Sequence, residues 1–463
     1  MKEAKKRIKE FATEYTVQNA VKKGDGATKL SMIIMGAGNL ARKEFIKGIL
    51  FLLSEISFIM MMVLFGLNAL ASLPSLGTEE QAEIFDETTQ TYIYTDGDNS
   101  MLILLWGIVT ISLILGFVVV WRANMKSAYK AQLRKERGQH IPTFIEEMRT
   151  YADTCLNKTL LFLPVMGVLI FTIMPLIFMI SMAFTNYDRD HQPPGKLFDW
   201  VGLQNFGAVL DFTGDLGRTF WPVLGWTIVW AIFATFLNYI FGMILAMIIN
   251  RKDTKFKSFW RFGFVLSVAV PQFVTLLLMN QMLQPEGAIN VLLRQLGLIG
   301  AGESLPFLTD VTWARVTVIV INLWVGIPYT ILTMTGILQN IPAELYEAAK
   351  IDGANPFVTF FKITLPYMLF VTAPSLITSF VGNVNNFNVI YLLTGGAPAT
   401  MDYYKMTAGK TDLLVTWLYK LTIDNKDYSL GAVIGILVFI ITATSSLIVY
   451  RHTSAYKNEE GFQ

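Results

Sequence analysis

Amide and aromatic side chains occur inside long apolar stretches of this 463-residue chain. They are Gln272, Asn322, Asn383, Asn385 and Asn386, accompanied by Trp324, Tyr329 and Phe387. An amide both donates and accepts hydrogen bonds, as sugar hydroxyls require, and an aromatic face can cover the apolar side of a pyranose. The combination favours binding of an uncharged, polyhydroxylated solute. The alternative is structural, because amides between membrane helices also hydrogen-bond one another, at roughly 0.6 to 2 kcal/mol each.

Groups suited to bond chemistry are missing from these stretches of the sequence. The last five apolar stretches have no ionisable Asp, Glu, Lys, Arg or His in their interiors, although such groups commonly mark ion pathways. His140, His191 and His452 are scattered, and the single Cys155 has no histidine or second cysteine near it. No phosphate-binding G-x-x-x-x-G-K-[ST] motif occurs. The sequence therefore predicts no catalytic residue and no metal site, and disfavours both an ion-coupled secondary transporter and a membrane enzyme.

The elements that must position these residues are membrane helices. Hydrophobic residues make up 53% of the chain, charged residues 16%, and mean hydropathy is +0.47. A spanning helix needs about 20 residues free of charge, and its backbone must be hydrogen-bonded internally. Eight charge-free intervals are long enough and predict an all-α bundle of eight transmembrane helices. They lie between Glu55 and Glu79, Asp98 and Arg122, Lys158 and Asp188, Arg218 and Arg251, Arg261 and Glu286, Arg315 and Glu344, Lys362 and Asp402, and Asp427 and Arg451.

The distribution of lysine and arginine predicts the orientation of this bundle. The N-terminal MKEAKKRIKE, the loop 122–158 and the loop RKDTKFKSFWR are basic and fall on one side. Residues 79–98 on the other side are acidic and contain no Lys or Arg. We therefore expect both termini in the cytoplasm. Near the N-terminus, the glycines of IIMGAGNLA are expected to form a flexible bend before the first membrane helix, since the βαβ context of a dinucleotide site is missing.

A charged segment, YEAAKIDGANPFVTFFKITLPY at residues 346–367, separates the sixth and seventh predicted helices on the cytoplasmic side. We expect a helix, a bend and a second helix. The signals are Asn340 as a cap, Pro342 and Glu344 in the first turn, Gly353 at the left-handed turn, Asn355-Pro356 at the second start and Pro366 as its limit. The small Ala348 and Ala349 allow close approach of another protein. An ordinary amphipathic connector is the alternative.

The same segment resembles the EAA signature, E-A-A-x3-G-x9-I-x-L-P, of the permease subunits of binding-protein-dependent ABC importers. Its spacing is complete, and it lies in the predicted cytoplasmic loop where that family has it. The resemblance implies a type-1 ABC importer permease fold, with this segment as the coupling helix that fits a cleft of the ATPase subunit. The coupling residues so implied are Glu347, Ala348, Ala349, Gly353, Ile363, Leu365 and Pro366.

A closer resemblance extends over approximately residues 158–455. FNVIYLLTGGAP, TAGKTDLLVTWLY and NLWVGIPY are similar to the MalF-type permeases of maltose and maltodextrin importers. This implies substrate contacts at Asn322, Gly326, Tyr329, Asn383 and Asn386, with Gln272 a candidate for a changed contact because the fifth stretch departs from the maltose pattern at Val268 and Gln272. Another neutral oligosaccharide is the alternative substrate. The large external domain of enterobacterial members is missing, since only residues 188–222 stand in its place.

The resemblance also implies the partners. A second homologous permease, two ATPase subunits and an extracellular solute-binding lipoprotein would complete a bacterial plasma-membrane importer. This chain would then be a non-catalytic subunit that holds no cofactor, with ATP and Mg²⁺ on the ATPase subunits, and it would bind no nucleic acid.

Five segments are expected along the chain. They are a cytoplasmic arm (1–45), two membrane helices with a basic loop (46–157), a third helix with an external loop (158–221), a core permease domain (222–451) and a cytoplasmic tail (452–463). Pro271, Pro328 and Pro374 are expected to break their helices within the core domain.

Overall fold

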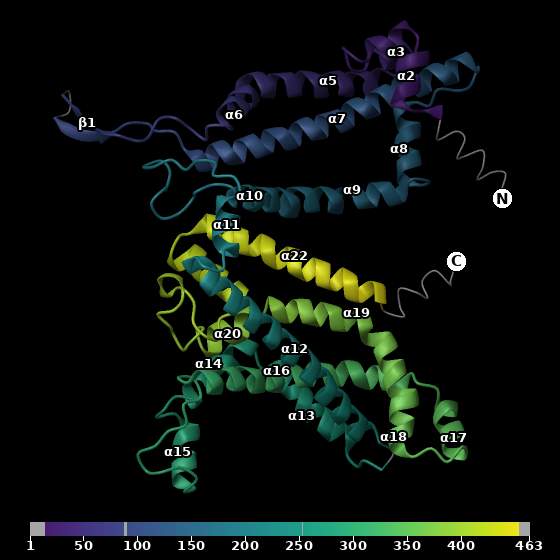
Figure 1. Ribbon diagram of the computed structural model, residues 1–463. Coiled ribbons are helices and arrows are strands. Elements are labelled where there is room, and N and C mark those ends of the chain that lie inside the picture. Colours follow the sequence, from purple (N-terminus) through teal and green to yellow (C-terminus); the bar gives the residue numbers. More distant parts are fainter. Residues whose placement is uncertain (1–13, 88–89, 252, 453–463) are drawn as a thin grey trace. The chain divides into compact units, whose positions relative to one another are not determined.

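The computed structural model describes residues 14–87, 90–251 and 253–452. The N-terminal run MKEAKKRIKE, Lys252 and the tail beyond His452 therefore lie outside the described residues. The chain forms two compact units, Met1–Val201 and Gly202–Gln463. Both are built almost wholly of helices, so the expected all-α class is confirmed (Figure 1).

Three long helical runs dominate the first unit. The first passes through α5 (Phe45–Met61), the π-helical turn η1 (Met62–Gly66) and α6 (Leu67–Ser72). The second is α7 (Ser100–Glu136), and the third comprises α9 (Leu156–Val168), η2 (Leu169–Ile173) and α10 (Met174–Met182). Strands β1 (Glu83–Asp86) and β2 (Thr91–Tyr94) form an antiparallel hairpin between the first two runs, and α8 (Phe144–Ala152) joins the second to the third.

The first run begins at Phe45 and therefore extends through Glu55, the residue that bounds the charge-free interval in the sequence. The carboxylate of Glu55 accepts a hydrogen bond of 2.8 Å from the backbone N–H of Met35. A paired carboxylate costs far less to bury than an isolated one, and a helix can therefore continue through it.

The chain before this run is folded onto α7. It forms α2 (Val17–Lys23), α3 (Gly26–Leu30) and α4 (Ala37–Leu40). The backbone N–H of Gly36, at φ 86°, donates to Asn124 Oδ1 over 2.9 Å. A Cβ atom at Gly36 would lie 2.1 Å from the carbonyl oxygen of Gly48, so only glycine fits. The glycines of IIMGAGNLA thus serve close packing against α5 and α7, where a flexible bend was expected.

The second unit contains the remaining elements. They are α11 (Gln204–Leu210), α12 (Asp215–Asn250), α13 (Lys257–Ala269), α14 (Gln272–Met282), α15 (Ala288–Gln295), α16 (Val311–Gln339), α17 (Ala343–Ile351), α18 (Pro356–Thr359), η3 (Phe360–Thr364), α19 (Leu365–Val384), α20 (Phe387–Leu393), η4 (Tyr404–Met406), α21 (Leu414–Tyr419), η5 (Lys420–Asp424) and α22 (Tyr428–His452).

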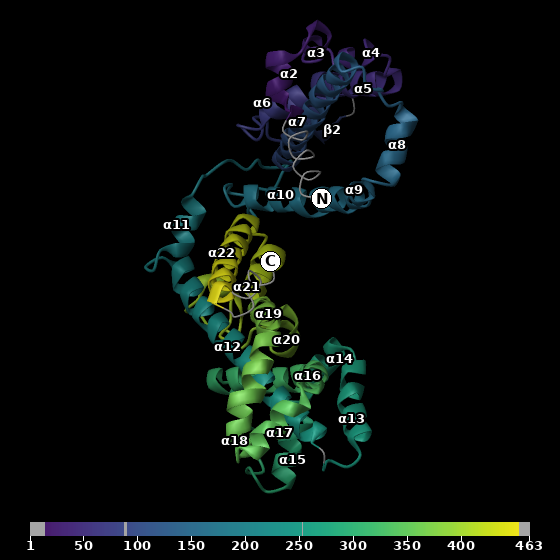
Figure 2. The same cartoon turned by 90° about the vertical axis from the view of Figure 1, so that its right-hand side faces the viewer.

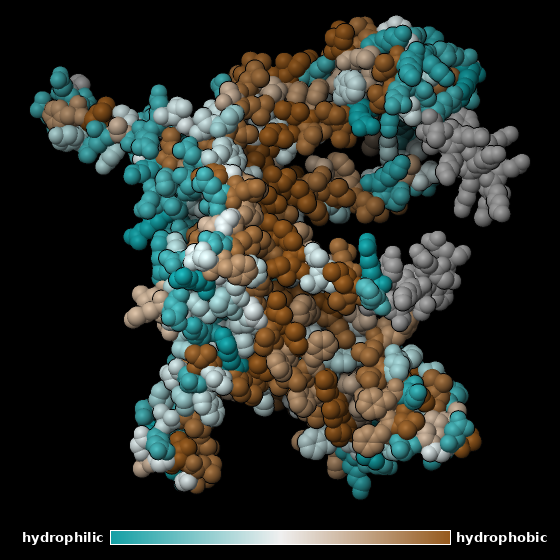
Figure 3. All heavy atoms as spheres, viewed as in Figure 1, coloured by the Kyte–Doolittle hydropathy of each residue, from teal (hydrophilic) through white to brown (hydrophobic). Residues whose placement is uncertain are grey.

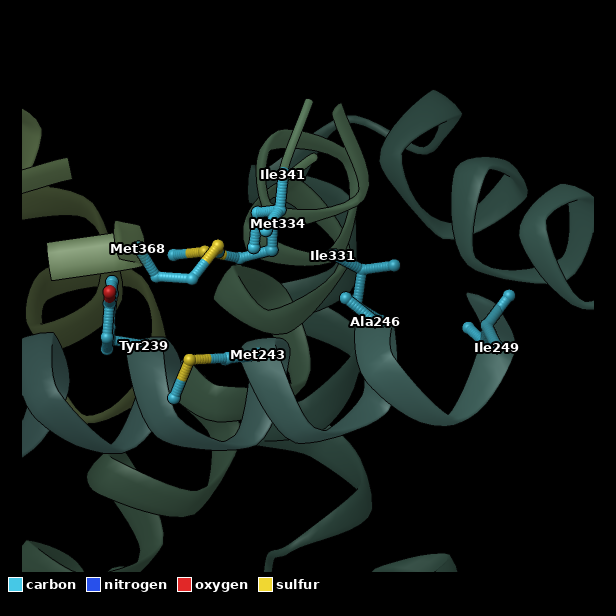
Figure 4. Packing of buried hydrophobic residues seen from close by; sticks show 8 residues of the cluster. All are labelled: Tyr239, Met243, Ala246, Ile249, Ile331, Met334, Ile341 and Met368. Carbon is cyan, nitrogen blue, oxygen red and sulfur yellow. The ribbon is translucent and has the colours of Figure 1, made fainter. Parts of the chain in front are cut away.

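Helices α12 and α16 form the central packed pair of this unit. Tyr239, Met243 and Ala246 recur every three to four residues on one face of α12 and meet Ile331 and Met334 of α16 (Figure 4). Next to them, a Cβ atom at Gly242 would lie 2.4 Å from Cγ2 of Thr330, which shows how closely the two backbones approach. This packing fixes the faces of α12 and α16 that border the cavity described below.

Seven helical runs of the described chain are long and apolar enough to cross a membrane, and the bent pair α13–α14 makes eight if it is one span. Apolar atoms cover the middle of the long helices in each unit, with polar atoms at their ends (Figure 3). Pro271 lies at the junction of α13 and α14, which meet at 87° (Figure 2), so the break expected there is confirmed. Pro328 and Pro374 lie inside the continuous α16 and α19; the breaks expected at these two residues were wrong, because membrane helices tolerate proline where neighbouring groups satisfy the freed carbonyls.

The connection between α20 and α22 is folded tightly. Asp412 Oδ2 accepts hydrogen bonds of 2.6 Å from both the backbone N–H of Gly409 and Nζ of Lys420. Lys420 Nζ also donates to the carbonyl oxygen of Gly395, over 2.7 Å. Helix α21 and the π-helical turn η5 lie within this connection, and their Leu414, Trp417 and Leu421 are buried. The TGGAP and GKTD sequence segments therefore hold this connection together.

Candidate functional site

A cavity of about 270 Å³ lies between α12, α16 and α19. Its lining consists of Ala234, Thr235, Asn238, Tyr239, Gly326, Tyr329, Thr330, Thr333, Met334, Ser375, Leu376, Ser379 and Asn383. Three predicted substrate contacts, Gly326, Tyr329 and Asn383, are therefore brought together although they come from two different helices.

Asn383 is held by α12. Its Nδ2 donates to Oγ1 of Thr235 over 3.0 Å, and its backbone carbonyl accepts a hydrogen bond of 3.0 Å from Nε1 of Trp230. Trp230 is fully buried, so it fixes the end of α19 against α12. The amide of Asn383 is thus presented at the cavity by a rigid support.

Gly326 permits a close contact on the same wall. A Cβ atom at this position would lie 2.5 Å from Nδ2 of Asn238, whose amide donates to the carbonyl oxygen of Ala234 over 2.8 Å. Oδ1 of Asn238 is buried and has no hydrogen-bond partner among the described residues. Gly326 therefore leaves room for the side chain of Asn238. It has no side chain with which to contact a ligand.

The other three predicted contacts lie off this lining. Gln272 begins α14, and its Oε1 accepts a hydrogen bond of 3.4 Å from Nδ2 of Asn388. Asn386 caps α20, where its Oδ1 accepts from the backbone N–H of Val389 over 3.3 Å. Asn322 is buried on α16, and its Nδ2 has no partner among the described residues. A contact of these three residues with substrate stays a prediction.

The described side chains that line the cavity carry no formal charge. Its lining holds hydroxyl, amide and aromatic groups, and none of the described residues that form it is Asp, Glu, Lys, Arg or His. A charged ligand would lose its hydration here without gaining a counter-charge. The arrangement suits a solute that is rich in hydroxyl groups and carries no charge.

The charged segment between α16 and α19 forms the expected helix, bend and helix. Gly353 has φ 74° after α17, and Oδ1 of Asn355 accepts a hydrogen bond of 2.9 Å from the backbone N–H of Val358 at the start of α18. Glu347 and Ala348 are exposed on α17. Ile363 and Leu365 pack against the core of α12 and α16 instead. One half of the signature thus faces outward while the other half attaches it to the helix bundle.

Two details of this segment differ from expectation. Asn340 does not cap α17, which begins after Pro342 without a side-chain cap; Asn340 is the C-cap residue directly after α16. Pro366 does not limit the second helix, because helical structure continues from α18 through the π-helical turn η3 into α19. A proline lacks one N–H and clashes with the carbonyl four residues earlier, here Lys362, and the wider π turn lies at that point.

Comparison with known proteins shows which family the chain belongs to. Residues 238–455, which include most of the cavity lining and the charged segment between α16 and α19, match the family model described as binding-protein-dependent transport system inner membrane component. The galactooligosaccharides transport system permease protein GanP of Bacillus subtilis is 38% identical over 437 residues, covering 93% of this chain and 98% of GanP. The chain belongs to this permease family.

Two further similarities agree with this assignment. The permease is 35% identical over 442 residues to the maltodextrin transport system permease protein MdxF of Bacillus subtilis, covering 93% of this chain and 96% of MdxF. A crystal structure of a bacterial ABC transporter involved in the import of the acidic polysaccharide alginate superposes with a TM-score of 0.52 and 22% identity, over 66% of this chain and 96% of that chain. The permease thus has the expected importer fold, spans the cell membrane several times and, like its family, is not a catalytic subunit.

Sequence reasoning missed much of the polar lining in this permease. The missed residues are Thr235, Asn238, Thr330, Thr333, Ser375 and Ser379. Their spacing is a usable signal, since Ser375, Ser379 and Asn383 recur every four residues and must share one face of α19. Small hydroxyl residues are common in membrane helices, which is why their type alone did not identify them.

Proposed function

We propose that this permease forms, together with a second homologous permease, the membrane path of an importer for a neutral oligosaccharide of the maltodextrin class. The observation that carries the proposal is the uncharged cavity in which Asn383 and Tyr329 come together. The similarity to MdxF supports the maltodextrin class. Amide and hydroxyl groups would bind the sugar hydroxyls, and the aromatic ring would cover an apolar face.

A galactooligosaccharide is the second candidate. GanP, at 38% identity, supports it, and Gln272 and Val268 depart from the maltose pattern in a region next to α20. Both candidates are neutral sugars, so the two proposals share the same cavity chemistry.

Partners of this permease would supply the energy and the solute. In the proposal, one of two ATPase subunits docks on α17 around the exposed Glu347. ATP and Mg²⁺ are bound by the ATPase subunits and not by this chain. An extracellular solute-binding lipoprotein delivers the sugar at the opposite side, and both termini are cytoplasmic. Solute then moves by alternating access, which requires a difference in affinity between the two permease conformations.

An apolar groove supports the second permease as a partner. Its volume is about 1220 Å³, and it is open between α12 and the segment from α17 to α19. Large exposed side chains such as Phe357 and Ile248 line it. A helix of a second permease would cover this surface, as large exposed apolar patches commonly mark interaction sites.

Uptake by the reconstituted importer tests the proposal. Vesicles containing this permease, its sister permease and the ATPase would receive labelled maltodextrin or labelled galactooligosaccharide with the cognate binding protein. ATP-dependent accumulation of maltodextrin is expected, with galactooligosaccharide preferred only if the second candidate is right. Accumulation without ATP, or of acidic oligosaccharides alone, would contradict the proposal.

A further inference from the structure

Helix α15 lies at one end of the second unit. It follows α14, which is half of a bent membrane span, and precedes the N-terminus of α16. The coupling helix α17 follows the other end of α16, so α15 and α17 lie at opposite ends of that long helix. Figure 1 shows α15 running across the direction of α16.

The helix is short but well defined at its C-terminus. Gly297 has φ 70°, its N–H donates to the carbonyl oxygen of Arg294 over 3.0 Å, and the N–H of Leu298 donates to the carbonyl oxygen of Leu293 over 3.0 Å. This pair of bonds is a Schellman motif, which satisfies carbonyl groups that a helix end otherwise leaves unpaired. The end of α15 is therefore a folded structure.

Two contacts set the rotation of α15 about its axis. Asn290 is buried, and its Nδ2 donates to the carbonyl oxygens of Gln284 and Leu305 over 3.0 and 3.2 Å. At the helix start, a Cβ atom at Gly287 would lie 2.4 Å from the carbonyl oxygen of Met282, so the chain turns closely around the end of α14. The side of α15 that carries Asn290 must face the protein.

The opposite side of α15 is apolar and uncovered. Ala288, Val291, Leu292 and the C-cap residue Leu296 lie at i, i+3, i+4 and i+8 on one helix face, and all four are exposed; the exposed Gln295 is the polar residue among them. Leu292 and Leu296 are 53% and 63% exposed. Figure 3 shows the apolar atoms of α15 on the side nearer to the apolar surface of the membrane helices.

We propose that α15 is an interfacial helix whose Val291–Leu292–Leu296 face inserts into the outer leaflet of the bilayer. The preceding helix α14, half of the bent span, also carries exposed apolar side chains, with Leu277 and Leu278 48% and 56% exposed. A short helix with one apolar face, lying across the spanning helices at the end of a span, has the geometry of a monotopic membrane helix. Only the assignment to the outer leaflet rests on the proposed function; the lipid contact itself does not.

Site-specific fluorescence tests this contact. In the intact importer complex, Cys155→Ser removes the single cysteine, and Leu296→Cys then carries an environment-sensitive NBD dye. The complex is placed in phosphatidylcholine vesicles with or without nitroxide on the acyl chains. We expect loss of most of the NBD emission with nitroxide lipid and little loss with aqueous iodide. The matched control is Glu286→Cys, whose native side chain is 81% exposed and polar, and the expected order of quenching is reversed there.

Each other outcome overturns the proposal. Strong iodide quenching at position 296 would place the face in water, and protection from both quenchers would place a protein on it. If the dye at position 296 were protected from both quenchers only after the binding protein was added, the apolar face of α15 would be a docking surface for that protein. Leu292→Cys repeats the measurement in case position 296 disturbs the fold, and sugar uptake measured on the same vesicles reports separately on the proposed function.

Discussion

Asn383 and Asn385 have the same side chain two positions apart but differ in surroundings. Asn383 lines the cavity and is supported by Thr235, whereas the exposed Asn385 donates back to the carbonyl oxygen of Val381 over 3.1 Å, at the end of α19. Substituting each of the two residues in turn therefore tests the proposed substrate contact of Asn383 against a matched control at the helix end.

Asn383→Ala is expected to weaken sugar transport while Asn385→Ala leaves it unchanged. One lost hydrogen bond of about 0.5–1.5 kcal/mol corresponds to roughly a two- to tenfold rise in the sugar concentration for half-maximal uptake. Tyr329→Ala is expected to act in the same direction through loss of the aromatic contact. Uptake kinetics in vesicles measure the effect, with assembly of the complex checked by co-purification. If the variants took up sugar as well as the unmodified permease, Asn383 and Tyr329 would have a structural role and no contact with substrate.

Residue types could be predicted at this scale, but their partners could not. Amides in apolar stretches identified Asn383, and the resemblance added Gly326 and Tyr329. Gln272 and Asn386 lie off the lining: Gln272 accepts a hydrogen bond from Asn388 of α20, and Asn386 caps the start of α20. Whether an amide faces a cavity or a helix end depends on where helices begin, and a break such as that between α19 and α20 is only visible in three dimensions.

At the scale of the element, the proposed coupling helix α17 is held to the following helices at several points. The hydroxyl groups of Tyr346 on α17 and Thr364 on η3 lie within 3.0 Å, and Ile363 and Leu365 pack on the bundle core. Between α17 and α18, the chain reverses at Gly353, where a Cβ atom would meet nothing within 4 Å. A substitution there therefore acts through backbone conformation and not through a clash.

Gly353→Val is expected to uncouple ATP hydrolysis from transport, whereas Gly353→Asn retains most of the coupling. A positive φ costs an ordinary residue roughly 1–2 kcal/mol, and more for a β-branched one, while asparagine tolerates it better. ATPase co-purification and ATP hydrolysed per sugar imported measure the difference. Glu347→Trp, a bulky change on the exposed face of α17, should reduce ATPase binding as well. Normal assembly and transport in Gly353→Val and Glu347→Trp would count against the docking role.

The fold of the N-terminal helices around Asp25 should be less stable in acid. Burial raises the pKa of Asp25, but hydrogen bonds from Thr28 and Arg42 together with the Arg42 charge outweigh it and hold this pKa below its ordinary value of 3.8. The stabilisation is therefore fully present above that ordinary value and is lost as pH falls through the lower folded pKa. Hydrogen exchange of residues 14–42, measured from about pH 6 to about pH 3 after correction for intrinsic rates, should show loss of protection at the acid end. Asp25→Asn should remove this step, and an identical step in that variant would assign it to another group.

At the scale of the whole molecule, charge spacing predicted the membrane-crossing helices well. Eight charge-free intervals correspond to seven runs and one bent pair. The charge-free interval is shorter than the first run, because the helix continues through Glu55, whose carboxylate is paired. The folding of the chain before Phe45 onto α7 could not be predicted either, since it depends on Asn124 and other residues far away in sequence.

The orientation of the chain can be tested with reporters fused after Gln463. Basic loops predict a cytoplasmic C-terminus. Green fluorescent protein at this position should therefore fluoresce, whereas alkaline phosphatase should be inactive. Active alkaline phosphatase would show that the C-terminus is external. The predicted orientation would then be wrong, and α17 would lie on the side away from a cytoplasmic ATPase.

The uncharged lining of the cavity also bears on bioenergetics. Moving one elementary charge across the membrane involves about 2.3 kcal/mol per 100 mV. A neutral cargo that passes described side chains without formal charge carries no current, so the electrical gradient neither aids nor opposes its passage. A cell that has lost its membrane potential could then continue to import the sugar by this route for as long as it contained ATP.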